Sequence, residues 1–390
     1  MKSIRLGIIG VGGMGGVHAQ YILGGKVTGC CLGAVCDIDP AAWQPTAGVR
    51  FYQDYRSLLQ SGDVDACLVA TPHWLHTEIG IAVLKAGLHL LVEKPIAVHK
   101  AAALQLLAAH RNRKEQVFSA MLNQRTNPAF IKIRSLIARG ALGPLTRIHW
   151  NITDWFRTNA YYRSSNWRAT WAGEGGGVLL NQAIHNLDLY QWMFGMPCAV
   201  QGFCHFGRFH PIEVEDDVTA YFEHPGGASG LFVTSTGESP GTNRLEVVGD
   251  KGRLLYENGS LHLWKNKTSS ARLIQTSPQA YLAATTTQRE IPLPPGIGSQ
   301  HIGILNNFAA AILRKTPLIA PAAEGLPCVE LANSILFSSL EGRKITLPLN
   351  ADAYACQLIK LVTSSKPQKH TKKIAPVKSA RPYLVESDKH

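Results

Sequence analysis

A glycine-rich turn close to the N-terminus constrains the fold of this chain more than any other feature of its sequence. The residues Gly10-Val11-Gly12-Gly13-Met14-Gly15 follow an apolar run at 4–10 and open an amphipathic segment at 14–23. Glycines allow the chain to turn sharply and leave backbone N–H groups open to an approaching anion. The pattern therefore predicts a strand, a tight turn and a helix whose N-terminus binds phosphate.

The next hundred residues repeat this alternation of short apolar runs and longer amphipathic segments. Such alternation is typical of βαβ units, in which parallel strands form a doubly wound sheet covered by helices. Ligands bind these sheets in the crevice at the carboxyl ends of the strands. We therefore predict a Rossmann-type, dinucleotide-binding α/β domain at residues 1–123. The further predicted strands are 32–36, 66–70, 88–92 and 117–121, and the further predicted helices are 76–86 and 100–111.

Asp37, at the end of the second predicted strand, indicates which dinucleotide binds. A carboxylate at this place accepts hydrogen bonds from the ribose hydroxyls of NAD and repels the 2′-phosphate of NADP. NAD is therefore the expected cofactor, and a tight turn that binds no ligand is the alternative. The residues of this domain assigned to the cofactor are Gly10, Gly12, Gly13, Met14, Gly15, Asp37, Thr71, Pro72, His73, His76, Glu93 and Lys94.

Lys94 is the residue of this domain expected to contact a substrate directly. It follows the strand predicted at 88–92, and Pro95 keeps it out of helical geometry. An ammonium group beside the cofactor ring hydrogen-bonds a substrate hydroxyl and stabilises alkoxide character as hydride leaves. A surface lysine beside a turn is the alternative that these residues alone leave open.

After residue 123 the pattern changes to that of an α+β domain, predicted at 124–350. A helix is predicted at 129–139, an extended run at 145–152, and an apolar helix at 177–194 after an irregular segment. Six alternating runs follow, separated by hairpin-like turns, which predicts a large, mostly antiparallel open sheet. These predicted strands are 200–206, 218–223, 229–235, 244–248, 253–257 and 261–264.

Three polar residues share one face of the helix predicted at 177–194. Asn181, His185 and Asp188 are spaced i, i+4 and i+7, and at about 100° per residue this spacing places them on one stripe. His185 exchanges protons near neutral pH, and Asp188 either orients it or ties down the helix. For His185 alone, a hydrogen-bonded core histidine is the alternative.

An aromatic and arginine-rich segment at 154–171 precedes this helix. Aromatic faces suit the apolar side of a pyranose ring, and arginine suits hydroxyl, carboxylate or phosphate groups. The segment is therefore predicted to face the substrate, and a packed strand and turn that cover the cofactor are the alternative. Arg157, Tyr162, Arg163, Trp167, Asn181 and Asp188 are assigned to the substrate, and Trp171 is assigned to the cofactor.

Together these motifs resemble the Gfo/Idh/MocA oxidoreductases, which include glucose–fructose oxidoreductase and inositol dehydrogenase. The motifs are the glycine turn, ATP-x-x-x-H at 70–76, Glu93-Lys94-Pro95, Gln124-Arg125, and GGG-x-x-x-N-x-x-x-H-x-x-D at 175–188. The resemblance implies a nicotinamide cofactor that Gln124 and Arg125 also contact, a homodimer or homotetramer, and a sugar or cyclitol substrate. It further implies that Lys94 contacts the reacting hydroxyl and that His185 transfers its proton.

The resemblance has one departure, at Asn181, where many members carry aspartate. An amide orients a substrate but neither holds a negative charge nor accepts a proton, so Lys94 and His185 are expected to perform the acid–base chemistry. The leading hypothesis is an NAD-dependent dehydrogenase that transfers hydride between nicotinamide and a secondary hydroxyl or keto carbon of a sugar, glycoside or cyclitol. The alternatives are NAD-assisted hydrolysis or epimerisation through a transient keto intermediate, and a non-catalytic sensor of NAD and sugar.

Charge and composition limit the other classes of function. The net charge is +12, from 39 Lys and Arg against 27 Asp and Glu, but seven of the basic residues lie in the tail at 364–390. This tail is predicted to be disordered, with a specific anionic tether as the alternative, and nucleic-acid binding is not expected.

The sequence has no apolar stretch of the roughly 18 residues that span a membrane. With no signal peptide and no metal-spaced Cys/His cluster, a cytoplasmic protein without a metal is expected.

Overall fold

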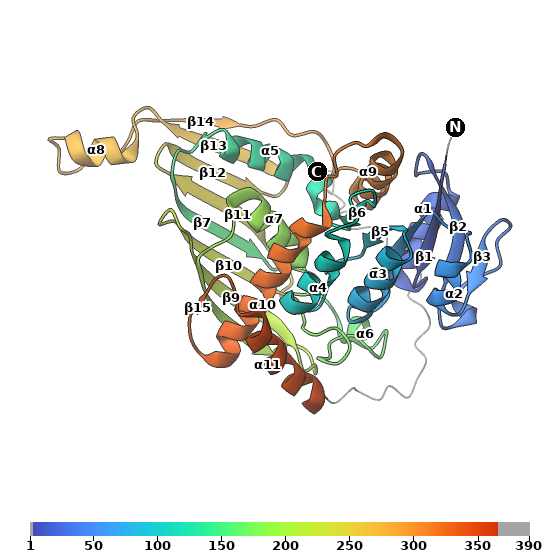
Figure 1. Ribbon diagram of the computed structural model, residues 1–390. Helices are drawn as coiled ribbons and strands as arrows, with labels where there is room; N and C mark the ends of the chain where they lie inside the picture. Colours follow the sequence, from blue (N-terminus) through green and yellow to red (C-terminus); the bar gives the residue numbers. More distant parts are fainter. Residues whose placement is uncertain (1–2, 366–390) are drawn as a thin grey trace.

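A computed structural model describes residues 3–365 and shows two β-sheets flanked by helices (Figure 1). The strands of the N-terminal sheet are β1 (Ile4–Ile9), β2 (Cys30–Cys36), β3 (Arg50–Tyr52), β4 (Ala66–Val69), β5 (His89–Val92) and β6 (Phe118–Ala120). They lie in the order β3-β2-β1-β4-β5-β6, and every neighbouring pair is parallel. The strand order reverses between β1 and β4, and doubly wound sheets bind ligands at this switch point. The predicted doubly wound sheet is confirmed.

Four helices follow the strands of this half, and all but the second were predicted from the alternation. They are α1 (Gly13–Leu23), α2 (Tyr55–Gln60), α3 (Leu75–Lys85) and α4 (Lys100–His110). The side chain of Asp54 caps the N-terminus of α2, and that of His99 caps α4. Because helices pack on the sheet, β4 is buried at all four of its residues and reads as a continuous apolar run.

The C-terminal sheet is larger and mixed. Its strands are β7 (Leu145–Ile152), β8 (Ala199–Phe206), β9 (Glu215–Glu223), β10 (Ser229–Ser235), β11 (Asn243–Gly249), β12 (Gly252–Glu257), β13 (Ser260–Asn266), β14 (Thr286–Glu290) and β15 (Ile345–Thr346). They lie in the order β14-β13-β12-β11-β7-β10-β9-β8-β15. β7 pairs parallel with β10, and the other neighbours pair antiparallel. The predicted, mostly antiparallel sheet is confirmed.

One face of this sheet is covered by helices. The covering helices are α5 (Pro128–Ala138), α7 (Ile184–Phe194) and α10 (Leu326–Glu341) (Figure 1). Along β10, Gly230, Phe232 and Thr234 are buried, whereas Leu231 and Val233 between them are partly exposed. The alternation that marked these strands in the sequence therefore reflects a sheet with one buried face.

The helix predicted at 177–194 begins only at Ile184, so the first part of that prediction is wrong. The residues before it form successive turns. The buried carboxylate of Glu215 accepts hydrogen bonds from the N–H of Gly177 (2.8 Å) and from a second N–H two residues later (3.1 Å). The glycines that precede these turns also have little helix propensity. Asn181 therefore lies in a turn and does not belong to a helical stripe.

Several elements have no counterpart in the prediction. α10 is the clearest example, because most of its 16 residues are buried and no amphipathic stripe marks it in the sequence. β14 is exposed at every residue and lacks the apolar alternation of the other strands. Besides α2, the further unpredicted helices are α6 (Asn159–Tyr162), α8 (Ser270–Thr276), α9 (Gln300–Arg314) and α11 (Ala351–Ser364).

The chain returns to the first sheet after most of the second sheet is formed. The N–H of Thr28 donates to the side chain of Asn306 in α9 (2.7 Å), and the hydroxyl of Ser119 in β6 donates to the carbonyl of Ala320 (2.7 Å). An isolated bridge pairs Ser119 with Pro321. The predicted boundary between 1–123 and 124–350 thus separates the strands of the two sheets. A later segment of the chain nevertheless packs against the first sheet.

α11 continues the described chain past the end of the predicted second domain and packs near α4 and α10. The prediction of a disordered tail at 364–390 falls, apart from its first two residues, outside the described residues. No helix within 3–365 combines the length and the apolar character needed to cross a bilayer.

Candidate active site

The glycine turn between β1 and α1 has the geometry that a pyrophosphate requires. Gly10 has a φ of +89°, and a Cβ atom on Gly15 would lie 1.8 Å from the carbonyl oxygen of Gly10. Cβ atoms on Gly12 and Gly13 would meet no atom within 4 Å, which leaves space in front of the helix. α1 has no acidic residue in its first turn, where Met14 is 38% exposed, so its N-terminal N–H groups suit an anion.

Asp37 lies beside the glycine turn and fits the ribose of NAD. One carboxylate oxygen accepts a hydrogen bond from the N–H of Val11 (2.9 Å), and the other accepts one from the N–H of Asp39 (3.1 Å). Neutral amides hold the negative charge at the end of β2. The next residue, Ile38, is 88% exposed and offers an apolar surface beside the carboxylate. A carboxylate at this place fits the ribose hydroxyls of NAD, which donate to it, and repels a 2′-phosphate.

The residues predicted after β4 are Thr71, Pro72, His73 and His76, and the two histidines join separate segments of the site. His76 is fully buried, with its ring nitrogens 2.7 Å from the carbonyl oxygen of Pro95 and 2.8 Å from that of Thr71. Burial lowers the pKa of His76, so the neutral ring donates to one of these oxygens. His73 lies 3.2 Å from the carbonyl oxygen of Glu174, in the second domain. Both rings therefore contact backbone.

Glu93 is a buried carboxylate with two partners. One oxygen lies 2.6 Å from Nε2 of His18, and the other accepts a hydrogen bond from the N–H of Lys94 (3.1 Å). Burial alone would raise the pKa of Glu93, but the contact with His18 and the nearby His301 and Lys94 lower it to about 2. Glu93 therefore carries a negative charge close to Lys94.

Lys94 is oriented by Asn181. Its ammonium group donates to the carbonyl oxygen of Asn181 (2.9 Å) and to Oδ1 of the same residue (3.3 Å). An ammonium has three N–H donors, and no other acceptor within residues 3–365 takes the third. Burial lowers the pKa of Lys94, and the charge of Glu93 opposes that shift. The amine is thus held with one donor available to a bound oxygen.

His185, in the first turn of α7, is partly buried, and its Nδ1 has no hydrogen-bond partner among the described residues. Burial lowers the pKa of His185 well below its ordinary value, and the positive charge of Lys94 adds to the effect. The imidazole is therefore neutral near pH 7 and able to accept a proton. Because Lys94 acts on the pKa of His185, the amine of the first domain and the imidazole of the second lie within electrostatic reach of each other.

Tyr161 is the centre of the aromatic and arginine-rich segment. Its ring lies near the guanidinium groups of Arg157 (5.0 Å) and Arg168 (4.6 Å). Its hydroxyl accepts hydrogen bonds from Arg168 (2.7 Å) and from the side-chain amides of Asn181 (3.3 Å) and Gln182 (3.1 Å). Two cations and a hydroxyl thus lie next to the residue that orients Lys94. Such a group of donors suits hydroxyl or carboxylate oxygens of a ligand.

The neighbouring residues predicted to bind substrate lie differently. Tyr162 is buried, with its ring 4.7 Å from that of His210 and its hydroxyl donating to Thr236 (2.9 Å). Arg163 follows α6 and is exposed. Tyr162 therefore supports this segment from within the fold, and Tyr161 holds the contacts to Asn181.

The two tryptophans contact protein side chains at the junction of the domains. The ring of Trp167 lies 5.5 Å from that of His73. Trp171 is 5% exposed, faces Phe206 at 5.9 Å, and accepts a hydrogen bond at its carbonyl oxygen from the indole of Trp74 (3.2 Å). Trp171, assigned to the cofactor from the sequence, thus packs between the two sheets.

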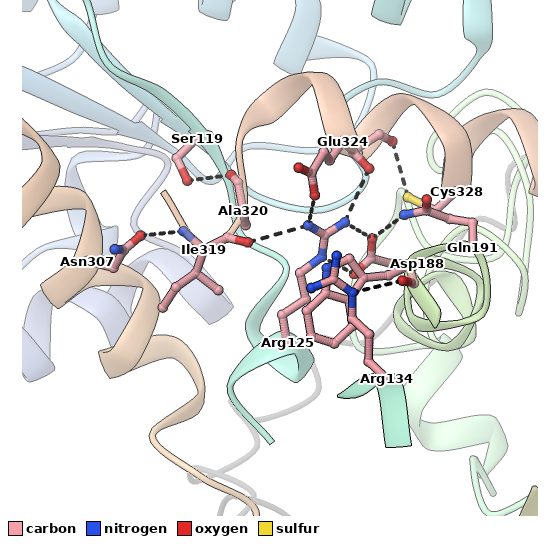
Figure 2. Close-up of polar contacts among 12 residues, drawn as sticks. Ser119, Arg125, Arg134, Asp188, Gln191, Asn307, Ile319, Ala320, Glu324 and Cys328 are labelled. Atoms are coloured by element: carbon pink, nitrogen blue, oxygen red, sulfur yellow. Dashed lines mark hydrogen bonds and ion pairs between the residues drawn. The ribbon is translucent and has the colours of Figure 1, made fainter. Parts of the chain in front are cut away.

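Arg125 and Asp188 form a buried ion pair with each other (Figure 2). Arg125, in η2 (Asn123–Thr126) next to the partly buried Gln124, donates to both carboxylate oxygens of Asp188 at 2.9 and 2.6 Å. Glu324, of η3 (Ala322–Gly325), contacts the same guanidinium. Burial alone would lower the pKa of Arg125, but the two carboxylates raise it. Both oxygens of Asp188 therefore bond Arg125, and the pair links α7 to η2. The predicted contacts of Asp188 with the substrate and of Arg125 with the cofactor stay predictions.

Four site residues are missing from the prediction: His18, Tyr161, Glu174 and His301. None of them belongs to a motif with a recognisable chemical spacing. Each meets its partner only in the folded chain, as His18 does at Glu93 over 75 residues. For Tyr161, the aromatic and arginine-rich composition was the available signal, but it does not distinguish Tyr161 from Tyr162.

Comparison with known proteins identifies relatives of both halves. Residues 4–121 match the family model described as "Oxidoreductase family, NAD-binding Rossmann fold", and residues 130–255 match "GFO/IDH/MocA C-terminal domain". Trans-1,2-dihydrobenzene-1,2-diol dehydrogenase of Bos taurus is 28% identical over 255 residues, which are 64% of this chain and 67% of the relative. Inositol 2-dehydrogenase of Rubrobacter xylanophilus is 28% identical over 195 residues, 49% of this chain and 52% of the relative. The matches thus cover about half to two thirds of these relatives.

The fold is also shared with solved structures. The WlbA dehydrogenase of Bordetella pertussis, in complex with NADH and UDP-GlcNAcA, superposes with a TM-score of 0.76 at 24% identity. The superposition covers 90% of this chain and 99% of that one. The family match to an NAD-binding Rossmann fold confirms the predicted cofactor, NAD.

Proposed function

Because the chain belongs to the Gfo/Idh/MocA family of oxidoreductases, we propose that it is an NAD-dependent dehydrogenase of a ring hydroxyl in a sugar, glycoside or cyclitol. The observation that carries the proposal is the state of two groups, Lys94 of the first domain and His185 of the second. Lys94 is held by Asn181 with one N–H donor left, and His185 is neutral with an unpaired Nδ1. A donor and a proton acceptor near each other are what oxidation of an alcohol requires.

NAD, when bound, supplies the acceptor for the hydride that leaves the alcohol carbon. The glycine turn holds the pyrophosphate, and Asp37 accepts hydrogen bonds from the ribose. Lys94 donates its third N–H to the alcohol oxygen and stabilises the negative charge that develops there. His185 takes the hydroxyl proton at a ring nitrogen, which its lowered pKa keeps free near pH 7. In the reverse direction His185 returns the proton.

The substrate class rests on the relatives and on the cluster around Tyr161. The relatives named above act, by their names, on a cyclic diol and on inositol, both of which carry neighbouring hydroxyls on one ring. Arg168 next to Tyr161 offers donors for such neighbouring hydroxyls or for a carboxylate. The experiment is therefore a panel of inositols, sugars, uronates, nucleotide sugars and cyclic diols, monitored by NADH absorbance.

Lys94→Met provides the decisive comparison in this assay. Loss of the N–H that stabilises developing charge should lower kcat by about 10²- to 10³-fold, while NAD still binds, because Asp37 and the glycine turn are unchanged. Lys85→Met, at the exposed end of α3, is the matched control and should retain full activity. Full turnover by Lys94→Met would remove this lysine from the mechanism, and a panel without any NADH formation would refute the proposed function.

A further inference from the structure

Glu174 is a buried carboxylate that the reaction outlined above does not use. It is 2% exposed and lies just before the three glycines at 175–177. One oxygen accepts a hydrogen bond from the N–H of Ala169 (2.6 Å), and the other accepts one from the side-chain amide of Asn181. The guanidinium of Arg168 lies 3.7 Å away. Burial raises the pKa of Glu174, while Arg168 and the N–H donors of Ala169 and Asn181 oppose that shift. Because N–H groups donate to both oxygens, these contacts favour the ionised carboxylate, which only accepts.

The loop that carries Glu174 is tightly closed around it. Ala169 has a φ of +56°, a conformation that is uncommon for a residue other than glycine. A Cβ atom on Gly173 would lie 1.9 Å from the carbonyl oxygen of Trp167. The loop therefore has little freedom, and the carboxylate stays at a fixed place beside Asn181.

Asn181 connects this carboxylate to Lys94. Its amide nitrogen donates to Glu174, so its amide oxygen must point the other way, where it accepts from the Lys94 ammonium at 3.3 Å. The Lys94 ammonium itself selects the oxygen end, because it only donates. Glu174 and the hydroxyl of Tyr161 hold the nitrogen end from the other side. Glu174 thus fixes the orientation of Asn181 together with Lys94 and Tyr161, and it is the anionic partner among them.

The charges around Lys94 give Glu174 a second effect. Arg168 and Arg157 disfavour a further positive charge there, whereas Glu93 and Glu174 favour it. The histidines that lie within electrostatic reach, His73, His76, His185 and His301, have lowered pKa values because of burial and are neutral near pH 7. Glu93 is already paired with His18. Glu174 is therefore the carboxylate of the second domain whose negative charge favours the protonated form of Lys94.

We propose that Glu174 is a positioning residue for Lys94: its carboxylate fixes the amide of Asn181 and supplies the negative charge that keeps the amine protonated. Glu174 touches neither the reacting oxygen nor the hydride, and it acts through Asn181. The proposal rests on the proposed function for the reaction that Lys94 serves, but the contacts that support it do not depend on the identity of a substrate.

The test measures Lys94 directly. Acylation of its amine by an amine-selective reagent, quantified by mass spectrometry from pH 6 to pH 11, gives the apparent pKa of Lys94 without any substrate. Glu174→Gln removes the charge but keeps an acceptor for Asn181, and we expect it to lower the apparent pKa by about one unit. Below that pKa, Lys94 should then be acylated up to about tenfold faster. Glu213→Gln is the matched control, because Glu213 bonds the N–H of Trp171 in the same loop, and it should leave the pKa unchanged.

A second variant moves the charge instead of removing it. Glu174→Gln with Asn181→Asp places a carboxylate directly on the position that contacts Lys94, and it should return the apparent pKa to the wild-type value or above. With an active substrate, the alkaline limb of the kcat pH profile should shift in the same order among the variants. An unchanged pKa in Glu174→Gln, or no recovery in the double variant, would overturn the proposal. A wild-type enzyme that oxidises no compound would instead refute the proposed function, and the acylation result would still decide the role of Glu174.

Discussion

The buried pair of Arg125 and Asp188 yields the most quantitative prediction. Their side chains are 0% and 1% exposed and share two hydrogen bonds, of 2.9 and 2.6 Å. Asp188→Asn removes the charge and turns N–H groups toward the guanidinium, which leaves Glu324 as the only anionic partner of Arg125 within residues 3–365. Removal of one member of a buried ion pair costs about 3–5 kcal/mol of stability. Because Glu324 remains but its side chain is 48% exposed, we expect a loss of about 3 kcal/mol.

The assay is urea unfolding monitored by tryptophan fluorescence, with the free energy of unfolding compared at matched m-values. The exposed pair of Arg5 and Asp65 provides the control, since its side chains are 47% and 41% exposed. Asp65→Asn should cost only about 0–1 kcal/mol. The double variant Arg125→Met with Asp188→Leu should be more stable than Asp188→Asn, because no buried charge is left unpaired. A loss below about 1 kcal/mol for Asp188→Asn would refute the reasoning, as would a double variant that is no more stable.

Two further predictions concern the glycine turn and the response to pH. Gly15→Ala places a methyl group against the carbonyl oxygen of Gly10 and should lower both the melting temperature and the NAD affinity. Gly12→Ala meets no protein atom and should lower the NAD affinity alone; equal melting temperatures for the two variants would contradict the packing argument. Burial lowers the pKa of His301 to about 4, whereas in the unfolded chain this pKa lies near 6.5. The unfolded chain therefore takes up a proton first as the pH falls, and the stability present above pH 6.5 is lost toward pH 4. Between pH 7 and pH 4 the His301→Gln variant should therefore lose roughly 3 kcal/mol less stability than the wild type. If the urea midpoints of the two proteins fall in parallel with pH, this prediction is wrong.

The parts of the fold that could be predicted are those whose signal is local. β1, the glycine turn and α1 follow from one another within 20 residues, and the antiparallel strands carry a period of two because one face of their sheet is buried. α10 could not be predicted, because a helix buried on all sides has no polar face to set a period. The turns before α7 were predicted as helix, because the competing acceptor, Glu215, lies 38 residues further along the chain.

The candidate site also has a part that could be predicted from local sequence and a part that could not. Lys94 and His185 stand in motifs whose residue types and neighbours indicate their chemistry, and the structure places both where the domains meet. The contact between Lys94 and Asn181 spans 87 residues, and its geometry depends on the relative position of the two sheets. Asp188 has the right spacing for the same helical stripe, but its direction is set by Arg125, 63 residues away. Spacing along one helix cannot reveal a partner on another element.

The late return of the chain to β6 has a consequence for synthesis on the ribosome. Ser119 finds its acceptor, the carbonyl of Ala320, only 201 residues later. Until that segment emerges, the outer edge of the first sheet presents unsatisfied backbone groups to other nascent chains. A fragment that stops after the sixth strand would share this exposed edge, so we expect it to aggregate even though it contains every strand of its own sheet.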